Sequence, residues 1–412
     1  MRWRFPQYQT KAELEQRREY LSRIDSWWEA FRGNAERISD QWDIKGAPEF
    51  DLPRFMSEKL QQVDRMIMWE YGPAVNGPGH RLVITPESEH GLRAMVESLV
   101  ERAPEISGWE FYDSRLPESV TLAEASVSGR TGGWLDGVKV RVERDQHNLI
   151  GLTYFHSDFS GPDDQTGQHL AFVATESLLG ESCLNHWIGF IECERFSSGG
   201  LFRRKQTPPG LIGLDDLKPR VEAEIQTCLD QLPDQALREM RLLDENAEAV
   251  PGFTEWSLLK MEPPQKIDYA ARSDMFVATT AWVDCFSATH GRRPFSSRRF
   301  SKHGEVFCYL KTDGREGFTG EKWDDKGELE DDLQVALDEV GVGCVWGGGT
   351  GRIYSYVEFA LTDVTAGVEA IRRVLQQGRI HRRTWILFHD QDMQDEWIGA
   401  YDDTPKPPSD AE

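Results

Sequence analysis

One order of elements recurs three times along this sequence and limits its fold more than any other feature. The order is helix, strand, strand, helix and strand. In the first occurrence a helical pattern through Phe55 and Val63 precedes two strand-like runs, MIMWEYGP and HRLVITP. A second helix is predicted at residues 88–104, where the apolar side chains share one face. GWEFYDS, residues 108–114, has the composition of a closing strand.

The same order is predicted over residues 118–194 and again over residues 326–390. Each closing strand begins with a tryptophan after one flanking residue, and these tryptophans are Trp109, Trp187 and Trp385. Chance can give one such match, but three in the same order indicate an internally repeated α/β unit.

A strand placed before the first helix turns this unit into β-α-β-β-α-β, the ferredoxin-like arrangement. GEVFCYLKT, residues 304–312, supplies that strand in the third copy. The first two copies have the alternative of sharing one continuous sheet across residues 54–195. We therefore predict an α+β fold of repeated ferredoxin-like units, with antiparallel sheets and helices on one face.

Breaks in composition divide the chain further. Gly46–Pro48 ends a helical start in which Thr10 and Glu13 form a capping box, and FSSGGLFRRKQTPPGLIG has the glycine and proline content of a linker. The predicted divisions are an N-terminal helical segment at 1–50, an α+β domain at 51–196, a linker and bridging helix at 197–250, a ferredoxin-like domain at 251–402, and a disordered tail at 403–412.

Charge and cysteine usage narrow the class of protein. The chain has 47 basic and 70 acidic residues, a net charge of −23 that repels nucleic acid and anionic membranes and attracts basic partners. Acidity that serves solubility alone is the favoured alternative to a specific basic partner. No secretory signal and no apolar run of about 20 residues is visible, so we expect a cytoplasmic protein. Six scattered cysteines without a C-x-x-C pair fit reduced thiols better than disulfides or zinc.

The stretch VWGGGTGRIYSY, residues 345–356, is as rich in glycine as a phosphate-binding loop. Such a loop needs a helix and a Gly-Lys-Ser/Thr ending, whereas Arg352 and a strand-like run follow here. We therefore expect a hairpin whose glycines supply positive φ angles. An anion-binding nest in the turn is the alternative.

The segment 289–305 is the main basic cluster of this acidic chain. Guanidinium groups bind oxyanions in a bidentate way, so the segment is a candidate for binding an anion or a partner. The equally weighted alternative is that it pairs with the protein's own acidic surface. The candidate residues, beside His290, are Arg292, Arg293, Arg298, Arg299, Lys302 and His303.

FHDQDMQDEW, residues 388–397, gathers carboxylates after a predicted strand. Mg²⁺ and Ca²⁺ take oxygen ligands, which makes Asp390, Asp392 and Asp395 candidate metal ligands. The segment lacks the glycine and distal glutamate of a calcium loop, and a solvated turn before a short helix is the favoured interpretation.

No other pattern indicates catalysis. The histidines lack H-x-x-x-H or H-E-x-x-H spacing, and there is no G-x-S-x-G motif for a serine nucleophile. The first helix carries three aromatic residues that are candidates for an exposed apolar binding patch, namely Trp27, Trp28 and Phe31. Burial of these residues against the first sheet is favoured.

Two stretches carry a resemblance. The runs LVITPE, LVERAP and GWEFY, within residues 66–118, resemble a bacterial family of proteins with no assigned activity. The C-terminal stretch that begins with GGGTGRIYSYVEFALTD and ends with RRTWILFHDQDMQDEWIG is similar to proteins of the same kind. Together they cover about a third of the chain. The resemblance implies α/β repeats in a bacterial cytosolic protein and transfers no catalytic residue.

These observations favour a non-catalytic binding or regulatory module, inhibitor-like or immunity-like, for a protein partner with a basic surface. The alternative is an enzyme or small-ligand binder that recognises an anionic, phosphorylated molecule through the arginine-rich segment 289–305. Whether the chain is an enzyme stays open at this point, and no cofactor is expected.

Overall fold

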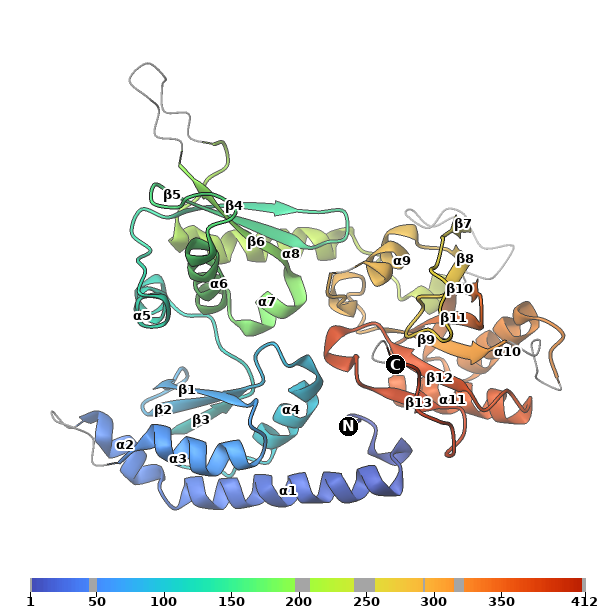
Figure 1. The fold of residues 1–412 in the computed structure, drawn as a ribbon, viewed down its shortest axis with the longest axis horizontal. Coiled ribbons are helices and arrows are strands. Elements are labelled where there is room, and N and C mark those ends of the chain that lie inside the picture. The colour runs from blue at the N-terminus through green and yellow to red at the C-terminus, as the bar shows by residue number, and fades with distance from the viewer. Residues whose placement is uncertain are drawn as a thin grey trace. The chain divides into compact units, whose positions relative to one another are not determined.

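The computed structural model describes residues 2–43, 50–196, 208–240, 256–291, 293–314 and 322–409. The chain forms two compact units and passes between them several times (Figure 1). Both units combine helices with sheets, which confirms the predicted α+β class. The first unit contains Met1–Val142, Leu152–Asn185 and Ile191–Lys218, and the second contains Glu143–Gly151, His186–Phe190 and Pro219–Glu412.

The first unit begins with a helical layer. Thr10 and Glu13 cap α1 through the predicted reciprocal hydrogen bonds, so α1 starts where the sequence indicates. Trp27, Trp28 and Phe31 are buried on α1, and the ring of Trp28 meets that of Phe111 at 4.8 Å. The favoured burial of this aromatic face is therefore confirmed. The helices of this layer are α1 (Lys11–Arg32), α2 (Ala35–Asp43) and α3 (Leu52–Lys59).

A three-stranded sheet packs against this layer in the order β1-β2-β3 (Figure 1). β1 and β2 form an antiparallel hairpin in which Met68 pairs with Thr85, and β2 runs parallel to β3 after a crossover through α4. Leu82 and Ile84 of β2 face the apolar core. The elements are β1 (Met68–Pro73), β2 (His80–Thr85), α4 (Arg93–Glu101) and β3 (Trp109–Tyr112).

A separate three-stranded sheet follows, in the order β4-β5-β6. The alternative of one continuous sheet across residues 54–195 is therefore wrong, because the two groups of strands do not pair with each other. Trp187 ends a short helix and does not open the closing strand, in contrast to Trp109. The elements are α5 (Val120–Thr131), β4 (Lys139–Arg144), β5 (Ile150–His156), α6 (Gln165–Leu179), α7 (Glu181–Trp187) and β6 (Ile188–Arg195).

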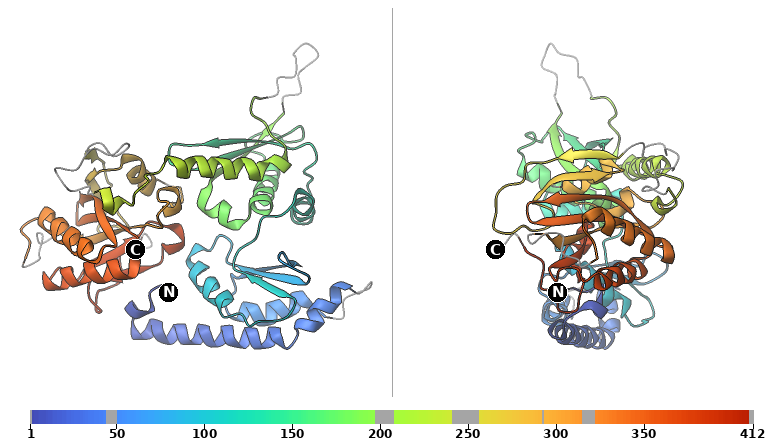
Figure 2. Two further views of the ribbon diagram at one scale, coloured as in Figure 1. Left: turned by 180° about the vertical axis from the view of Figure 1, so that it is seen from behind. Right: turned by 90° about the vertical axis from the view of Figure 1, so that its right-hand side faces the viewer.

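The second unit is built on a seven-stranded sheet with the order β13-β12-β9-β11-β10-β8-β7. Its centre follows the chain order strand, helix, strand, strand, helix, strand, and the pairs β10–β11, β11–β9 and β9–β12 are antiparallel. α10 and α11 lie side by side (Figure 2). The elements are α8 (Leu217–Gln231), β7 (Ser257–Lys260), β8 (Met275–Thr280), α9 (Val283–His290), β9 (Val306–Asp313), α10 (Lys326–Val340), β10 (Gly343–Gly351), β11 (Tyr354–Leu361), α11 (Val364–Gln377), β12 (Thr384–Phe388) and β13 (Trp397–Gly399).

The glycine-rich stretch lies inside β10 and only its end reaches the turn. A hairpin does join β10 to β11, but Gly347, Gly348 and Gly349 pair with β8 and β11 and none has a positive φ, so that part of the prediction is wrong. These glycines let neighbouring side chains and strands approach the backbone of β10 closely. A Cβ atom on Gly348 would lie 2.3 Å from Oε1 of Glu330, and one on Gly349 would lie 2.7 Å from the sulfur of Met275.

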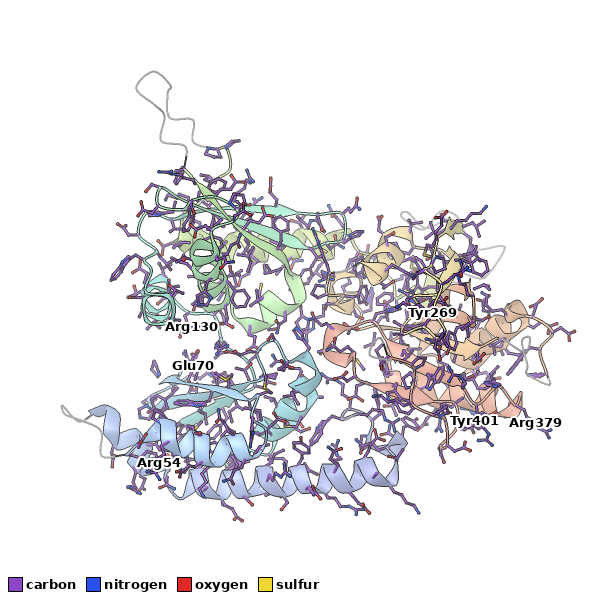
Figure 3. All side chains as sticks on the ribbon, in the orientation of Figure 1. Arg54, Glu70, Arg130, Tyr269, Arg379 and Tyr401 are labelled. Carbon is purple, nitrogen blue, oxygen red and sulfur yellow. The ribbon has the colours of Figure 1, made fainter. Side chains whose placement is uncertain are left out.

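The start of the C-terminal segment is held against the sheet. The indole nitrogen of Trp385 donates to the carbonyl of Pro405 at 2.6 Å, and Thr404 is buried beside Gly399. Tyr401 donates to the carbonyl of Ile380 at 2.9 Å, near the end of α11 (Figure 3). Residues 403–409 of the predicted tail thus follow a fixed path without helix or strand.

Candidate functional site

The arginine-rich segment 289–305 folds back on its own unit. Arg293 forms an ion pair with Asp145 at 2.6 Å, and Lys302 forms one with Asp234 at 2.7 Å. The ring nitrogen Nε2 of His303 lies 3.2 Å from the carbonyl of Pro233. Arg298 is exposed. The candidate Arg292 lies outside the described residues.

Arg299 departs most from what the sequence suggests. Its side chain is buried, with only 1% of the residue exposed, although its neighbour Arg298 faces solvent. Its guanidinium donates to the carbonyls of His186 at 2.8 Å and Pro294 at 2.6 Å, while Nε has no hydrogen-bond partner among the residues that the structure describes. Burial lowers the pKa of Arg299 to about 10, so it stays a cation at neutral pH.

A cavity of about 470 Å³ adjoins this segment, and all of its lining residues belong to the second unit. Leu149, Phe190 and Pro294 supply apolar walls, and Arg293 and Arg299 supply cationic ones. A concave, mostly apolar site with a few polar groups is the usual form of a small-molecule site. The structure thus brings two of the six predicted residues to one cavity and leaves Arg298, Lys302 and His303 outside it.

The acidic segment 388–397 has a structural anchor in Asp390. This carboxylate is buried and accepts hydrogen bonds from the backbone nitrogen of Ser297, at 2.7 Å, and from the hydroxyl of the same residue. Burial raises the pKa of Asp390 to about 6. Asp395 is exposed, and no group of three or more metal-binding side chains forms within the described ranges. Asp390, Asp392 and Asp395 are therefore not assembled as a ligand set.

A buried charged cluster that sequence reasoning missed lies in the core of the second unit. Glu358 on β11 pairs with Arg272 and with His389, whose Nε2 lies 2.7 Å from the carboxylate. His290 on α9 lies 3.1 Å from Arg272 through Nδ1. The ring of His389 stacks on Tyr309 at 4.8 Å. A histidine and a glutamate at this distance could exchange a proton, but both side chains are 4% exposed or less, so no substrate reaches them.

The electrostatics of this cluster follow from its burial. Burial alone would raise the pKa of Glu358, but the charge of Arg272 and contact with His389 lower it to about 2. Burial and Arg272 together lower the pKa of His389 to about 4 and that of His290 to about 3. The one sequence signal for this cluster is Glu358 itself, which interrupts the otherwise uncharged strand YSYVEFAL.

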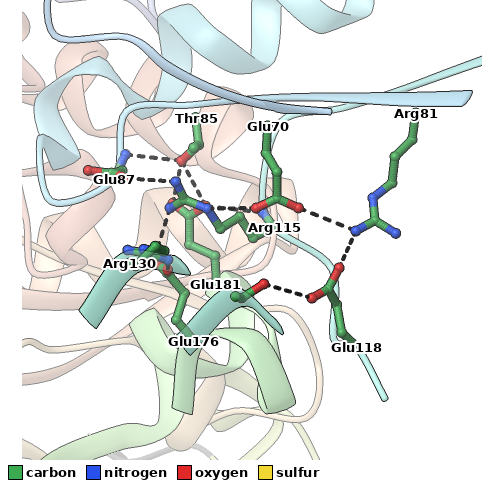
Figure 4. A network of polar contacts seen from close by, with 10 residues as sticks. Glu70, Arg81, Thr85, Glu87, Arg115, Glu118, Arg130, Glu176 and Glu181 are labelled. Atoms are coloured by element: carbon green, nitrogen blue, oxygen red, sulfur yellow. Dashed lines mark hydrogen bonds and ion pairs between the residues drawn. The ribbon is translucent and has the colours of Figure 1, made fainter. Parts of the chain in front are cut away.

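The first unit holds a second polar network, shown in Figure 4. Arg115 forms ion pairs with Glu87 at 2.6 Å, Glu176 at 2.9 Å and Glu70 at 3.2 Å. Glu70 lies on β1 and Glu176 on α6. Arg130 of α5 also pairs with Glu176, and Figure 3 labels Arg130 and Glu70 on facing parts of the unit. The network thus ties the first sheet to the helices α5 and α6.

Glu181 and Arg81 complete this network. Arg93 of α4 pairs with Glu181, and the hydroxyl of Thr85 donates to the same carboxylate at 2.6 Å. Arg81 pairs with Glu118 and, at 3.3 Å, with Glu70. The charged groups pair with one another inside the unit, which indicates a structural role for the network.

The outer face of α10 is a different kind of charged surface. Leu329, Leu333 and Leu337 are buried on the inner face. The outer face carries Val335, with 57% of the residue exposed, among carboxylates that form no ion pair with a described residue. These carboxylates are Glu328, Asp331, Asp338 and Glu339.

The cysteines offer no activated nucleophile among the described residues. Cys193, Cys228, Cys285, Cys308 and Cys344 are buried free thiols, and Cys183 is partly exposed. Burial raises the pKa of Cys193, Cys228, Cys285, Cys308 and Cys344, which keeps these thiols protonated.

Comparison of the chain with protein families, with curated proteins and with solved structures gives no match. The resemblance to a bacterial family therefore stays an expectation. Within the part of the chain that the structure describes, no helix has the length and apolar character needed to cross a membrane.

Proposed function

We propose that this protein is a non-catalytic binding or regulatory module, inhibitor-like or immunity-like, for a protein partner with a basic surface. The observation that carries the proposal is the unpaired acidic face of α10. Its carboxylates occupy positions 328, 331 and 338, three and seven residues apart, so they share one side of the helix with Val335.

Local geometry supports α10 as the contact surface. Lys322 and Lys326 near the start of the helix pair with Asp332 and Glu330, so neither of these two lysines neutralises the outer carboxylates. Unpaired exposed carboxylates keep their full field, which steers a basic partner toward them. Val335 at the centre supplies the apolar contact that a charged rim commonly surrounds.

A matched pair of variants tests this proposal. The first variant carries Glu328→Gln, Asp331→Asn and Asp338→Asn on α10. The second carries Glu15→Gln, Glu29→Gln and Glu36→Gln, which lie at exposed positions of α1 and α2. Both variants change the net charge by the same amount, so any difference between them reports on the α10 face and not on total charge.

The measurement is capture from a lysate of the host at low salt, followed by titration of the purified partner against each variant. We expect the wild-type protein and the α1/α2 variant to retain one basic protein in stoichiometric amounts. We expect the α10 variant to bind that protein at least about tenfold more weakly. Equal weakening in both variants, or retention of no stoichiometric protein, contradicts the proposal.

The same proposal includes two finer statements about the chain. One is a cytoplasmic location, which the buried free thiols of Cys193, Cys228, Cys285, Cys308 and Cys344 support. Fractionation of host cells with an antibody against the protein tests it, and recovery outside the cytoplasm contradicts it.

The other statement is that the three strand-strand-helix-strand segments are copies of one ferredoxin-like unit. In the first segment, β3 pairs directly with β2 in parallel. In the third segment, β9 lies between β11 and β12 and pairs with both. Superposition of these segments in an experimental structure tests the statement, and crossovers of opposite hand would contradict it.

A further inference from the structure

We propose that the cavity beside Arg293 and Arg299 binds a small organic anion, with a carboxylate or phosphate group carried on a flat apolar body. This inference concerns a different surface from the acidic face of α10 and does not rest on the proposed partner. It assigns a ligand site to Arg293, Arg299 and His147, with Phe190 as the apolar wall.

The buried charge of Arg299 is the first argument. A cation removed from water is costly unless an anion compensates it. The guanidinium of Arg299 meets two backbone carbonyls, and no described carboxylate lies within ion-pair distance of it. Its Nε also lacks a hydrogen-bond partner within the described part of the chain. The charges of Asp390 and Asp145 act on the guanidinium only from beyond contact distance. Because Arg299 lines the cavity, an anion bound there would supply a countercharge in direct contact.

The loop around Asp145 is the second argument. One carboxylate oxygen of Asp145 accepts from the backbone nitrogens of His147, at 2.8 Å, and Leu149, at 2.9 Å. The other accepts from Arg293 at 2.6 Å. The backbone holds Asp145 in place without Arg293, so Arg293 can turn toward a ligand while Asp145 keeps its position. Arg293 is about half exposed, and its guanidinium lies 5.7 Å from the centre of the Phe190 ring, so it already borders the apolar wall of the cavity.

His147 gives the third argument. Its ring nitrogen Nε2 is buried and has no hydrogen-bond partner among the described residues, although His147 lines the cavity. Buried polar atoms in native proteins are nearly always satisfied by protein, water or ligand. A neutral imidazole can donate a hydrogen bond to an oxyanion from this nitrogen. Three unsatisfied or movable donors therefore surround one cavity.

The chemical class of the ligand follows from charge and shape. Arg293 and Arg299 give two positive charges against the single negative charge of Asp145, so the lining favours an anion over a cation. Leu149, Phe190 and Pro294 cover the remaining walls, which an inorganic ion alone would leave in contact with water. A volume of about 470 Å³ accommodates a ring-sized body with one charged group.

Four probes separate these features in calorimetric titrations of the full chain. Benzoate and phenyl phosphate have both a flat apolar body and an anionic group. Benzyl alcohol has only the body, and inorganic phosphate has only the charge. For ligands of this size we expect a Kd on the order of 1 mM for whichever of the first two has the preferred head group. Benzyl alcohol and inorganic phosphate should each bind at least about tenfold more weakly.

Variants locate the binding. Arg293→Gln and Phe190→Ala should each weaken binding about tenfold, since one loses a charged donor and the other loses the apolar wall. Arg298→Gln is the matched control because Arg298 is a neighbouring exposed arginine that does not line the cavity. It should bind the probe within about twofold of the wild-type protein. Thermal unfolding of each variant shows whether it is folded.

Three outcomes would overturn the proposal. The first is the absence of binding by benzoate and by phenyl phosphate at 10-fold the expected Kd. The second is binding of benzyl alcohol as tight as that of benzoate or phenyl phosphate, which would mean that the cavity is an apolar pocket that does not recognise charge. The third is equal loss in Arg298→Gln and Arg293→Gln, which would mean attraction to the basic segment as a whole. Each of these leaves the α10 experiment unaffected, so the two proposals fail separately.

Discussion

His389 and Glu358 meet in the interior of the second unit, where Nε2 of the imidazole lies 2.7 Å from Oε2 of the carboxylate. Glu358 is also paired with Arg272, so one negative charge faces a permanent cation and a histidine that stays neutral at pH 7. The arrangement keeps one buried positive charge and one buried negative charge, with the two rings of His389 and Tyr309 stacked beside them.

The histidines of this cluster predict loss of stability in mild acid. The folded protein takes up a proton on His389 only near pH 4, whereas the unfolded chain does so near pH 6.5. The unfolded state therefore binds more protons between these values, and the free energy of unfolding falls as the pH drops from about 6.5 to 4. Urea unfolding followed by tryptophan fluorescence at several pH values measures the slope.

His389→Gln should make that slope shallower by up to about 1.4 kcal/mol per pH unit. The matched control is His303→Gln, since His303 is exposed. It should leave the slope unchanged. An unaltered slope in His389→Gln would show that His389 is not the group that takes up the proton.

Asp390 predicts the opposite dependence on pH. The pKa of Asp390 is about 6 in the folded protein, above the value of 3.8 for an unperturbed aspartate. The folded state therefore binds more protons between these values, and the free energy of unfolding falls as the pH rises from about 3.8 through 6. Asp390→Asn removes the buried charge and keeps an acceptor for the backbone of Ser297. We expect the asparagine variant to be as stable as the wild-type protein or more stable at pH 7.5, and the difference to vanish below pH 4.

Asp390→Ala is the comparison, because it leaves the backbone nitrogen of Ser297 without its acceptor and should cost about 1–3 kcal/mol. If asparagine and alanine are equally destabilising at pH 7.5, the carboxylate is stabilising as an anion and the assignment of its raised pKa is wrong.

Arg115 predicts a strong dependence of the first unit on one side chain. Arg115→Met leaves Glu70, Glu87 and Glu176 with fewer partners, and it leaves the buried carboxylate of Glu176 with one ion pair fewer. Removing one member of such a network costs about 3–5 kcal/mol. Arg54→Met breaks only the exposed pair with Glu58 and should leave the urea midpoint unchanged. Similar midpoints for the two variants would mean that Arg115 contributes little.

The crowded strand β10 predicts that a methyl group is not tolerated at Gly351. The added Cβ would lie 2.3 Å from a carboxylate oxygen of Asp274, which accepts hydrogen bonds from the backbone nitrogens of Ile353 and Tyr354. We expect Gly351→Ala to lower the free energy of unfolding by about 1–3 kcal/mol. Gly77→Ala is the control, since nothing lies within 4 Å of its added Cβ. Equal stability of the two variants would contradict this account of β10.

Features set by neighbouring residues could be predicted from the sequence. The start of α1 depends on Thr10 and Glu13, three positions apart, and the hairpin of β1 and β2 follows from alternating and apolar runs. The pairing of whole segments could not be predicted, because it depends on contacts between distant positions. The separation of the first two sheets is one example.

The candidate sites show the same limit. Arg298 and Arg299 are adjacent in sequence, yet one is exposed and the other is buried by His186 and Pro294. A basic segment indicates charge but not which side chains turn inward. The cluster of Arg272, Glu358 and His389 likewise joins residues about 30 and 90 positions apart, for which no spacing rule exists.

The glycines of β10 also affect how a mutational scan of this protein should be interpreted. Gly347, Gly348, Gly349 and Gly351 touch backbone atoms, Met275, Glu330 and Asp274, so nearly every substitution there meets an obstacle. A scan that scores activity alone would mark the strand as strongly as a binding site. Scoring the amount of folded protein in parallel distinguishes the two, since positions that only lack space lose protein and activity together, whereas Arg293 should lose binding while the protein remains folded.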